Sequence, residues 1–93
     1  MNILIVGFEN DISGAARTRL IEAIKSQNSW ARLNSNTYAV TTPLSAEQMR
    51  NHIVSSAGDI DQLFIYTVNN RYWATNSMPK DVNDWLQRNW SQT

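Results

Sequence analysis

The sequence predicts an α+β fold of the ferredoxin-like type, in which the elements follow the order βαββαβ and one further helix is appended. Three observations predict it. Apolar β-branched runs open the chain and recur after the second helical segment, two segments have helical periodicity, and a pair of short strand-like segments shares a polar turn. Right-handed crossovers would place the first and third strands at the centre of a four-stranded antiparallel sheet, with both helices on one face.

Length and composition indicate a single domain covering residues 1–93. The chain is 42% hydrophobic and 17% charged, which is ordinary for a packed globule. Eight Lys and Arg balance eight Asp and Glu, so any nucleic-acid site has to be local. The absence of Cys excludes disulfides, thiolate metal ligands and Cys nucleophiles. We expect a cytoplasmic protein without membrane contact, because no apolar segment approaches the roughly 20 residues that a bilayer requires.

The first strand and the first helix have clear signals. Residues 3–8, ILIVGF, are apolar without alternation, as expected for a strand covered on both faces. A helix is expected over residues 14–27, where Asp11 or Ser13 is placed to cap it. Its apolar residues recur at spacings of three and four: Ala16, Leu20, Ile21 and Ile24.

The second helix is expected over residues 46–57. Ser45 and Gln48 have the spacing of a capping box, and Leu44 can pack on Met49 as a hydrophobic staple. This is the best-marked helix start in the chain.

Four further segments have strand character. Two short strands are expected at residues 30–34 and 37–42, with NSN as the turn between them. The run DQLFIYTV predicts a strand over residues 62–68, and residues 71–75 are a candidate for one extra short strand.

A terminal helix is expected after Pro79, which is tolerated in a first helical turn. Its apolar face combines four residues: Val82, Trp85, Leu86 and Trp90. The sheet face opposite the first two helices would expose a large apolar surface unless this helix, a second copy of the chain, or both covered it. We therefore expect a homodimer.

A family resemblance covers almost the whole chain. The segments that carry it are LIEAIKS, the isolated Trp30, SNTYAV, LSAEQMRNHI, DQLFIYTV and VNDWLQ. Together they resemble short bacterial proteins described as SinR-like, which are similar to the smaller of the two CRISPR adaptation proteins and to the virulence-associated protein D toxins. The resemblance implies a ferredoxin-like homodimer. In the metal-dependent nucleases of this wider family an Asp ends the first strand and holds a divalent cation across the dimer axis, whereas Phe8 stands at that position here.

Glu9 and Asp11 are the carboxylates nearest to that position. Magnesium commonly uses one or two carboxylates together with substrate phosphates, so this pair is a candidate catalytic and metal-binding site. The alternative is structural: Glu9 solvates the end of a strand and Asp11 caps a helix, which is the commoner use of such residues. No cofactor is expected apart from Mg²⁺ in the catalytic case.

The other titratable residues favour structural roles. His52 lies beside the apolar stripe of the second helix, without a second His or a nearby Asp that would orient it as a base. Asp59 and Asp61 flank Ile60 after Gly58, a pattern typical of a turn before a strand.

Two groups of residues are candidate binding surfaces. Arg71, Tyr72 and Trp73 interleave a cation with aromatic rings, as surfaces that stack on unpaired bases do, and as protein interfaces do. The zero net charge favours the interface. The second group would form a phosphate-binding patch if its members converged, and would otherwise be ordinary solvated side chains: Arg17, Arg19, Arg32 and Arg50.

Three hypotheses about function follow from the sequence. The leading one is a non-catalytic or catalytically degenerate dimeric scaffold or interaction protein, similar to the CRISPR adaptation protein, in defence or mobile-element biology. The second is a Mg²⁺-dependent endoribonuclease or toxin that uses Glu9 or Asp11. The third is a nucleic-acid-binding protein without catalysis.

Overall fold

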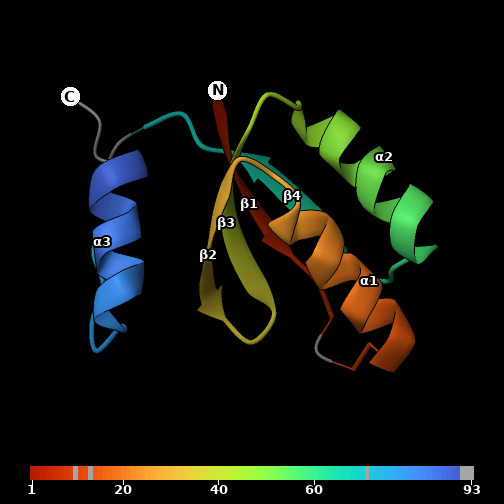
Figure 1. Ribbon diagram of the computed structural model, residues 1–93. Coiled ribbons are helices and arrows are strands. Elements are labelled where there is room, and N and C mark those ends of the chain that lie inside the picture. The colour runs from red at the N-terminus through yellow and green to blue at the C-terminus, as the bar shows by residue number, and fades with distance from the viewer. Residues whose placement is uncertain (10, 13, 71, 91–93) are drawn as a thin grey trace.

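The computed structural model has the predicted α+β architecture and describes residues 1–9, 11, 12, 14–70 and 72–90. A four-stranded antiparallel sheet in the order β2-β3-β1-β4 separates α1 and α2 on one side from α3 on the other (Figure 1). This strand order is consistent with the ferredoxin-like prediction. The elements are β1 (Asn2–Gly7), α1 (Gly14–Lys25), β2 (Ser29–Asn34), β3 (Thr37–Thr42), α2 (Ala46–Ala57), β4 (Phe64–Thr67) and α3 (Lys80–Asn89).

The first strand lies at the centre of the sheet, as predicted. Along one edge β1 pairs with β3, and along the other edge it pairs with β4. Because successive side chains of a strand point to opposite faces, Leu4 and Val6 pack toward α1 and α2. Ile5 belongs to the cluster beneath α3. Both faces of β1 are therefore covered, which explains why its sequence shows no alternation of apolar and polar residues.

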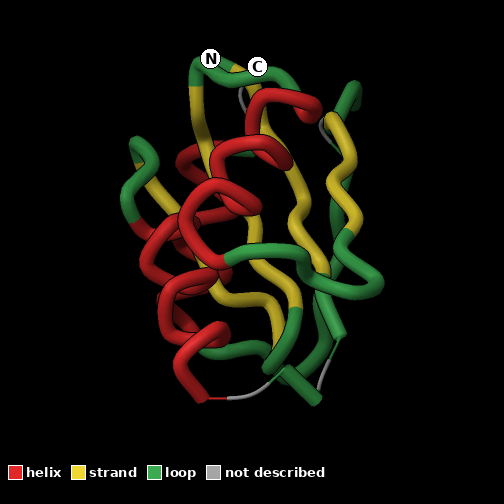
Figure 2. Tube along the Cα trace, turned by 90° about the vertical axis from the view of Figure 1, so that its right-hand side faces the viewer, coloured by secondary structure: helices red, strands yellow, loops and turns green. Residues whose placement is uncertain are grey.

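The main core lies between the sheet and the pair α1 and α2. Figure 2, viewed from the side of these helices, shows them in front of the strands. Fully burying one large aliphatic side chain contributes about 1.5 to 3 kcal/mol, so this cluster dominates the stability of the fold. Its largest members are Leu4, Val6, Phe8, Leu20, Ile24, Tyr38, Val40, Met49 and Ile53.

The predicted capping box at the start of α2 is confirmed. The backbone N–H of Gln48 donates to Ser45 Oγ over 3.1 Å, and the backbone N–H of Ser45 donates to Gln48 Oε1 over 2.9 Å. Leu44 packs against the same cluster as Met49. Gly58 ends the helix with a φ of 84°, a value that glycine adopts without the strain of a β carbon.

Helix α3 covers only part of the second sheet face. Val82, Trp85 and Leu86 pack against Ala31 of β2 and Ala39 of β3. The Trp85 indole N–H donates to Ser29 Oγ over 3.2 Å, which ties the helix to the edge of the sheet. The half of this face that belongs to β4 stays open.

Several predicted boundaries differ from the observed ones. The strand expected over residues 62–68 is limited to β4, because residues 61 and 62 still form a turn in which Gln62 has a φ of 57°. The extra strand expected at residues 71–75 is wrong for its described residues, 72–75, where Trp73 packs into the cluster under α3 instead. Pro79 directly precedes α3 and does not lie in its first turn. Helix α1 ends at Lys25, two residues earlier than expected.

None of the helices in the described part of the chain has the length and apolar character that crossing a bilayer requires.

Candidate functional site

The acidic loop after β1 lies beside a buried aromatic residue. Phe8 is only 2% exposed and belongs to the main core, and the Arg17 guanidinium lies 5.3 Å from the centre of its ring. Glu9 is partly buried and Asp11 is exposed. The capping candidate Ser13 lies outside the described residues. Among the residues that the structure describes, no three or more His, Asp or Glu side chains gather where they could share a metal ion. Magnesium binding by Glu9 and Asp11 stays a prediction.

His52 lies between α1 and α2 with its Nε2 atom 3.4 Å from Ser26 Oγ. The Ser26 hydroxyl already donates to the carbonyl oxygen of Ala23 over 2.7 Å. A hydroxyl has a single hydrogen to donate, so Ser26 cannot donate to His52 while it donates to Ala23. A nucleophile and base pair requires the imidazole to accept the hydroxyl proton, and this arrangement does not offer it. Asp59 and Asp61 are exposed where the chain turns toward β4.

Two of the four arginines converge on the turn between β2 and β3. An Arg17 Nη2 donor bonds the carbonyl oxygen of Ser35, and Arg32 Nε donates to the carbonyl oxygen of Asn34 over 3.4 Å. On the same side of β2, Lys25 Nζ lies 4.5 Å from the centre of the Trp30 ring. We call Arg17, Lys25, Trp30 and Arg32 the α1–β2 strip.

The other two arginines lie elsewhere. Arg19 lines a hollow between α1 and α2 together with Glu22 and His52. Arg50 bonds the side chain of its neighbour Asn51 on the exposed face of α2. Lys25 and Trp30 were not candidates from the sequence, because their pairing depends on how α1 lies along β2.

The aromatic residues after β4 do not share one exposed surface. Tyr72 is 87% exposed, whereas Trp73 is partly buried against the cluster under α3. Arg71, the third member of this candidate group, lies outside the described residues. Trp73 instead contributes to a pocket.

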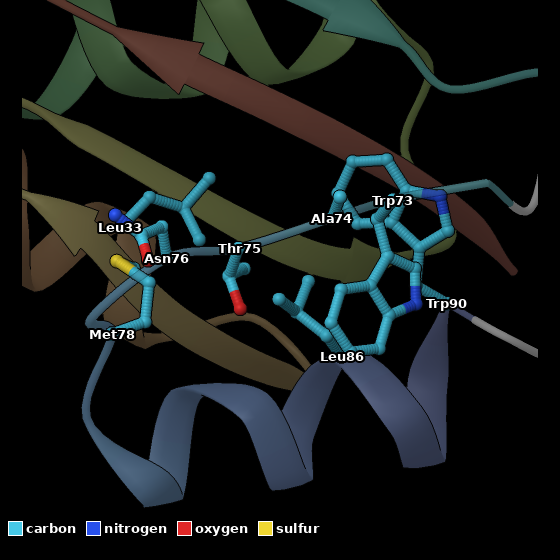
Figure 3. Close-up of a pocket in the computed structure, with 8 residues that line it drawn as sticks. All are labelled: Leu33, Trp73, Ala74, Thr75, Asn76, Met78, Leu86 and Trp90. Carbon is cyan, nitrogen blue, oxygen red and sulfur yellow. The ribbon is translucent and has the colours of Figure 1, made fainter.

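That pocket opens between the segment before α3, the helix itself and strand β2. Its volume is about 360 Å³. Figure 3 shows Trp73 and Trp90 toward one end, Leu33, Asn76 and Met78 toward the other, and Leu86 rising from α3 between them. Trp90 was expected to extend the buried seam of the helix, but it is partly buried and lines this opening. The full lining consists of Leu33, Trp73, Ala74, Thr75, Asn76, Met78, Leu86 and Trp90.

A second apolar surface lies on β4, at the margin of the sheet. Phe64 and Tyr66 project from the face that α3 leaves open and are 43% and 63% exposed, with ring centres 5.2 Å apart. β4 pairs with β1 along one edge, and no strand of the described chain lies along its other edge. The sequence marked this segment as a strand but not as a sheet margin.

No family model, curated protein or solved structure matches this chain. The resemblance to SinR-like and CRISPR adaptation proteins therefore stays a prediction.

Proposed function

We propose that this protein is a non-catalytic interaction module whose working form is a homodimer joined through β4. The single observation that carries the proposal is the open edge of β4 beside two exposed aromatic rings, Phe64 and Tyr66. Exposed strand edges are templates for pairing with another chain, and exposed apolar patches mark interaction sites.

The two margins of the sheet differ in how well they are protected against pairing. Strand β2 carries Arg32, its pairing with β3 is irregular between Arg32 and Asn34, and α3 packs against it. Charges, bulges and covering helices are the usual devices that block edge pairing. The β4 sequence FIYT has no charge and no proline, and its pairing with β1 is regular. This contrast favours β4 as the edge that joins a second copy.

The hydrogen-bond pattern of β4 supports a specific register for the dimer. Val68 N–H donates to the carbonyl oxygen of Ile3 over 2.9 Å. Since hydrogen-bonded and non-hydrogen-bonded pairs alternate in antiparallel strands, Ile65 and Thr67 direct their backbone groups away from β1. In the proposed dimer the two β4 strands would pair antiparallel around a two-fold axis at Ile65. The Ile65 residues of the two copies would then lie opposite each other and exchange two backbone hydrogen bonds.

The same axis would bring aromatic side chains together. Directly opposite residues in an antiparallel pair lie on one face, so Phe64 of each copy would meet Tyr66 of the other. Four rings would then cover the open half of the sheet face. Such cross-strand pairs each contribute about 0.2 to 1 kcal/mol, which favours a dimer of modest affinity.

The rim of α2 beside β4 is compatible with this symmetry. Glu47 and Arg50 are exposed and line a hollow with Leu63 and Ile65. A two-fold axis at Ile65 would bring the two rims together, and each rim offers one acid and one base. Opposite charges across an interface set register and discriminate against wrong partners. The resemblance to the smaller CRISPR adaptation protein supports the same kind of role, a dimer that acts as a scaffold in defence or mobile-element biology.

The test compares Thr67→Pro with Thr67→Val. Proline at an exposed edge position removes the outward N–H, and Thr67 does not use its N–H to bond β1, so the monomer should fold. Valine keeps the N–H and nearly the same shape. Sedimentation equilibrium from micromolar to millimolar protein measures the apparent molecular mass. For wild type and Thr67→Val this mass should rise with concentration from that of one chain toward that of two. For Thr67→Pro it should stay at the mass of one chain.

Two results would refute the proposal. One is a wild-type protein that stays at a single chain mass throughout this range. The other is a Thr67→Pro variant that dimerises as strongly as Thr67→Val. Near-ultraviolet circular dichroism and the urea midpoint establish beforehand that both variants are folded.

A second candidate function is binding of single-stranded nucleic acid along the α1–β2 strip. The observation that favours it is the convergence of Arg17 and Arg32 at one turn, with Lys25 stacked over Trp30 in line with them. Arg17 and Lys25 are eight residues apart on α1, a rise of about 12 Å, which spans more than one nucleotide. Stacked rings and cations are the usual combination in single-strand sites.

Fluorescence anisotropy with a labelled single-stranded oligonucleotide tests this candidate. Binding should weaken steeply as salt rises, and Trp30→Ala and Lys25→Gln should each reduce the affinity severalfold. Arg50→Gln on α2 is the matched control and should leave the affinity nearly unchanged. An equal loss of affinity for the oligonucleotide in all three variants would contradict this assignment. So would an affinity that does not change with salt concentration.

A further inference from the structure

Two hydrogen bonds hold the walls of the pocket beneath α3 together. The Trp90 indole N–H donates to the carbonyl oxygen of Asn70 over 3.0 Å, and the Thr75 hydroxyl donates to Asn83 Oδ1 over 2.7 Å. These bonds tie the segment before α3 to the beginning and the end of the helix. The walls of the pocket are thus held in place by bonds that do not depend on an occupant.

The interior is almost entirely apolar. Aliphatic walls come from Leu33 and Leu86, the flexible thioether of Met78 closes one side, and two indole rings complete the lining. None of the lining residues is an Asp, Glu, Lys or Arg. The polar side-chain groups are those of Thr75 and Asn76 and the two indole N–H groups, and the Trp90 N–H already donates to Asn70. A charged ligand would lose its hydration there without a compensating partner.

We propose that this pocket binds an uncharged, planar aromatic compound of about the size of a two-ring or three-ring system. Its volume of about 360 Å³ lies near the lower end of the range for small-molecule sites, which matches such a compound. Indole rings attract other rings by edge and offset stacking, and a thioether makes favourable contacts at a ring edge. The compound packs against the Trp73 and Trp90 rings at one end of the pocket and reaches Leu33 at the other, with Leu86 between them.

This site is independent of the proposed dimer. The pocket lies between α3 and β2, whereas the proposed pairing edge is β4 at the opposite margin of the sheet. Loss of one activity by mutation should therefore leave the other intact.

The test uses the full chain and the neutral fluorophore N-phenylnaphthylamine, whose emission rises in apolar sites. Ala74→Trp adds a large side chain at an exposed wall position and should fill the pocket without removing a core contact. Ala15→Trp adds the same side chain on the exposed face of α1 and is the matched control. We expect saturable binding to wild type and Ala15→Trp, and at least a tenfold weaker affinity in Ala74→Trp.

Nitrogen-15 correlation spectra of the indole N–H groups locate the probe. The signals of Trp73 and Trp90 should shift on titration, while that of Trp30 should not. Three outcomes overturn the proposal: no saturable binding to wild type, equal binding to Ala74→Trp and Ala15→Trp, or tighter binding of tetraethylammonium than of the neutral probe. Loss of probe binding in Tyr66→Ser with full binding in Ala74→Trp would overturn it as well, because the probe would then occupy the β4 surface.

Discussion

The ring of Phe64 in β4 lies over Gly7 in β1, directly across the antiparallel pair, and fills the space that a β carbon on Gly7 would need. An aromatic side chain that covers a glycine of the neighbouring strand protects backbone that would otherwise face water. Phe64 itself remains 43% exposed, with the centre of the Tyr66 ring 5.2 Å from the centre of its own ring, while Gly7 is buried.

Replacing Gly7 with alanine should destabilise the protein. The added methyl group overlaps the Phe64 ring, which must swing outward, and such overpacking typically costs about 1 to 3 kcal/mol. Urea denaturation measures the change in the free energy of unfolding. Gly14→Ala is the matched control, because no atom lies within 4 Å of its added carbon. Its stability should be equal or slightly higher, since alanine favours the helix. Equal stability of Gly7→Ala and wild type would contradict the close packing of this pair.

Loss of the capping box should weaken α2. In Ser45→Ala the backbone N–H of Gln48 loses its acceptor, and such N-cap substitutions cost about 1 kcal/mol. The midpoint of urea unfolding should fall accordingly. Ser55→Ala changes an exposed position inside the same helix and should be neutral or mildly stabilising. A larger loss in Ser55→Ala than in Ser45→Ala would show that the cap contributes little.

Detaching α3 from the sheet should expose the segment before it to proteases. Trp85→Ala removes a buried indole and its hydrogen bond to Ser29, at a cost of about 3 to 5 kcal/mol. Limited proteolysis should then cut within residues 72–79 faster than in wild type. Trp30→Ala removes the same kind of side chain from an exposed position and should leave this segment protected. Unchanged cleavage in Trp85→Ala would mean that α3 is held by other contacts.

Metal-dependent cleavage should be absent from the wild-type protein. The position at which the resemblance expects an Asp is Phe8, whose side chain is buried in the main core, and Asp11 is exposed on the loop that follows. Incubation with structured and unstructured RNA and DNA in Mg²⁺ or Mn²⁺ should yield no product above a metal-free control. The double variant Glu9→Ala and Asp11→Ala should behave identically. Cleavage by wild type that disappears in the double variant would establish the endoribonuclease alternative.

The order of the elements and the central position of the first strand could be predicted from the sequence alone. The signals are local: the unbroken apolar run of residues 3–8, the spacing of apolar residues in α1 and α2, and the capping box at Ser45 are each set by neighbours in the chain. Helix boundaries with such a cap were predicted to the residue, as for α2. The end of α1 has no such cap, and the helix ends two residues before the predicted boundary; Gln27 accepts a hydrogen bond from the Thr42 hydroxyl instead of lying in the helix.

Which residues share a surface depends on contacts between segments that lie far apart in the sequence. Arg17 and Arg32 meet at one turn while Arg19 lies on the opposite side of α1, and Trp73 joins Leu33 and Trp90 around a pocket. Helical rotation explains part of this, since residues two apart on a helix point in nearly opposite directions. The pocket and the exposed surface of β4 depend on how α3 packs on β2 and leaves β4 uncovered. Packing between distant segments is determined by the burial of whole apolar faces, which the local spacing of residues does not reveal.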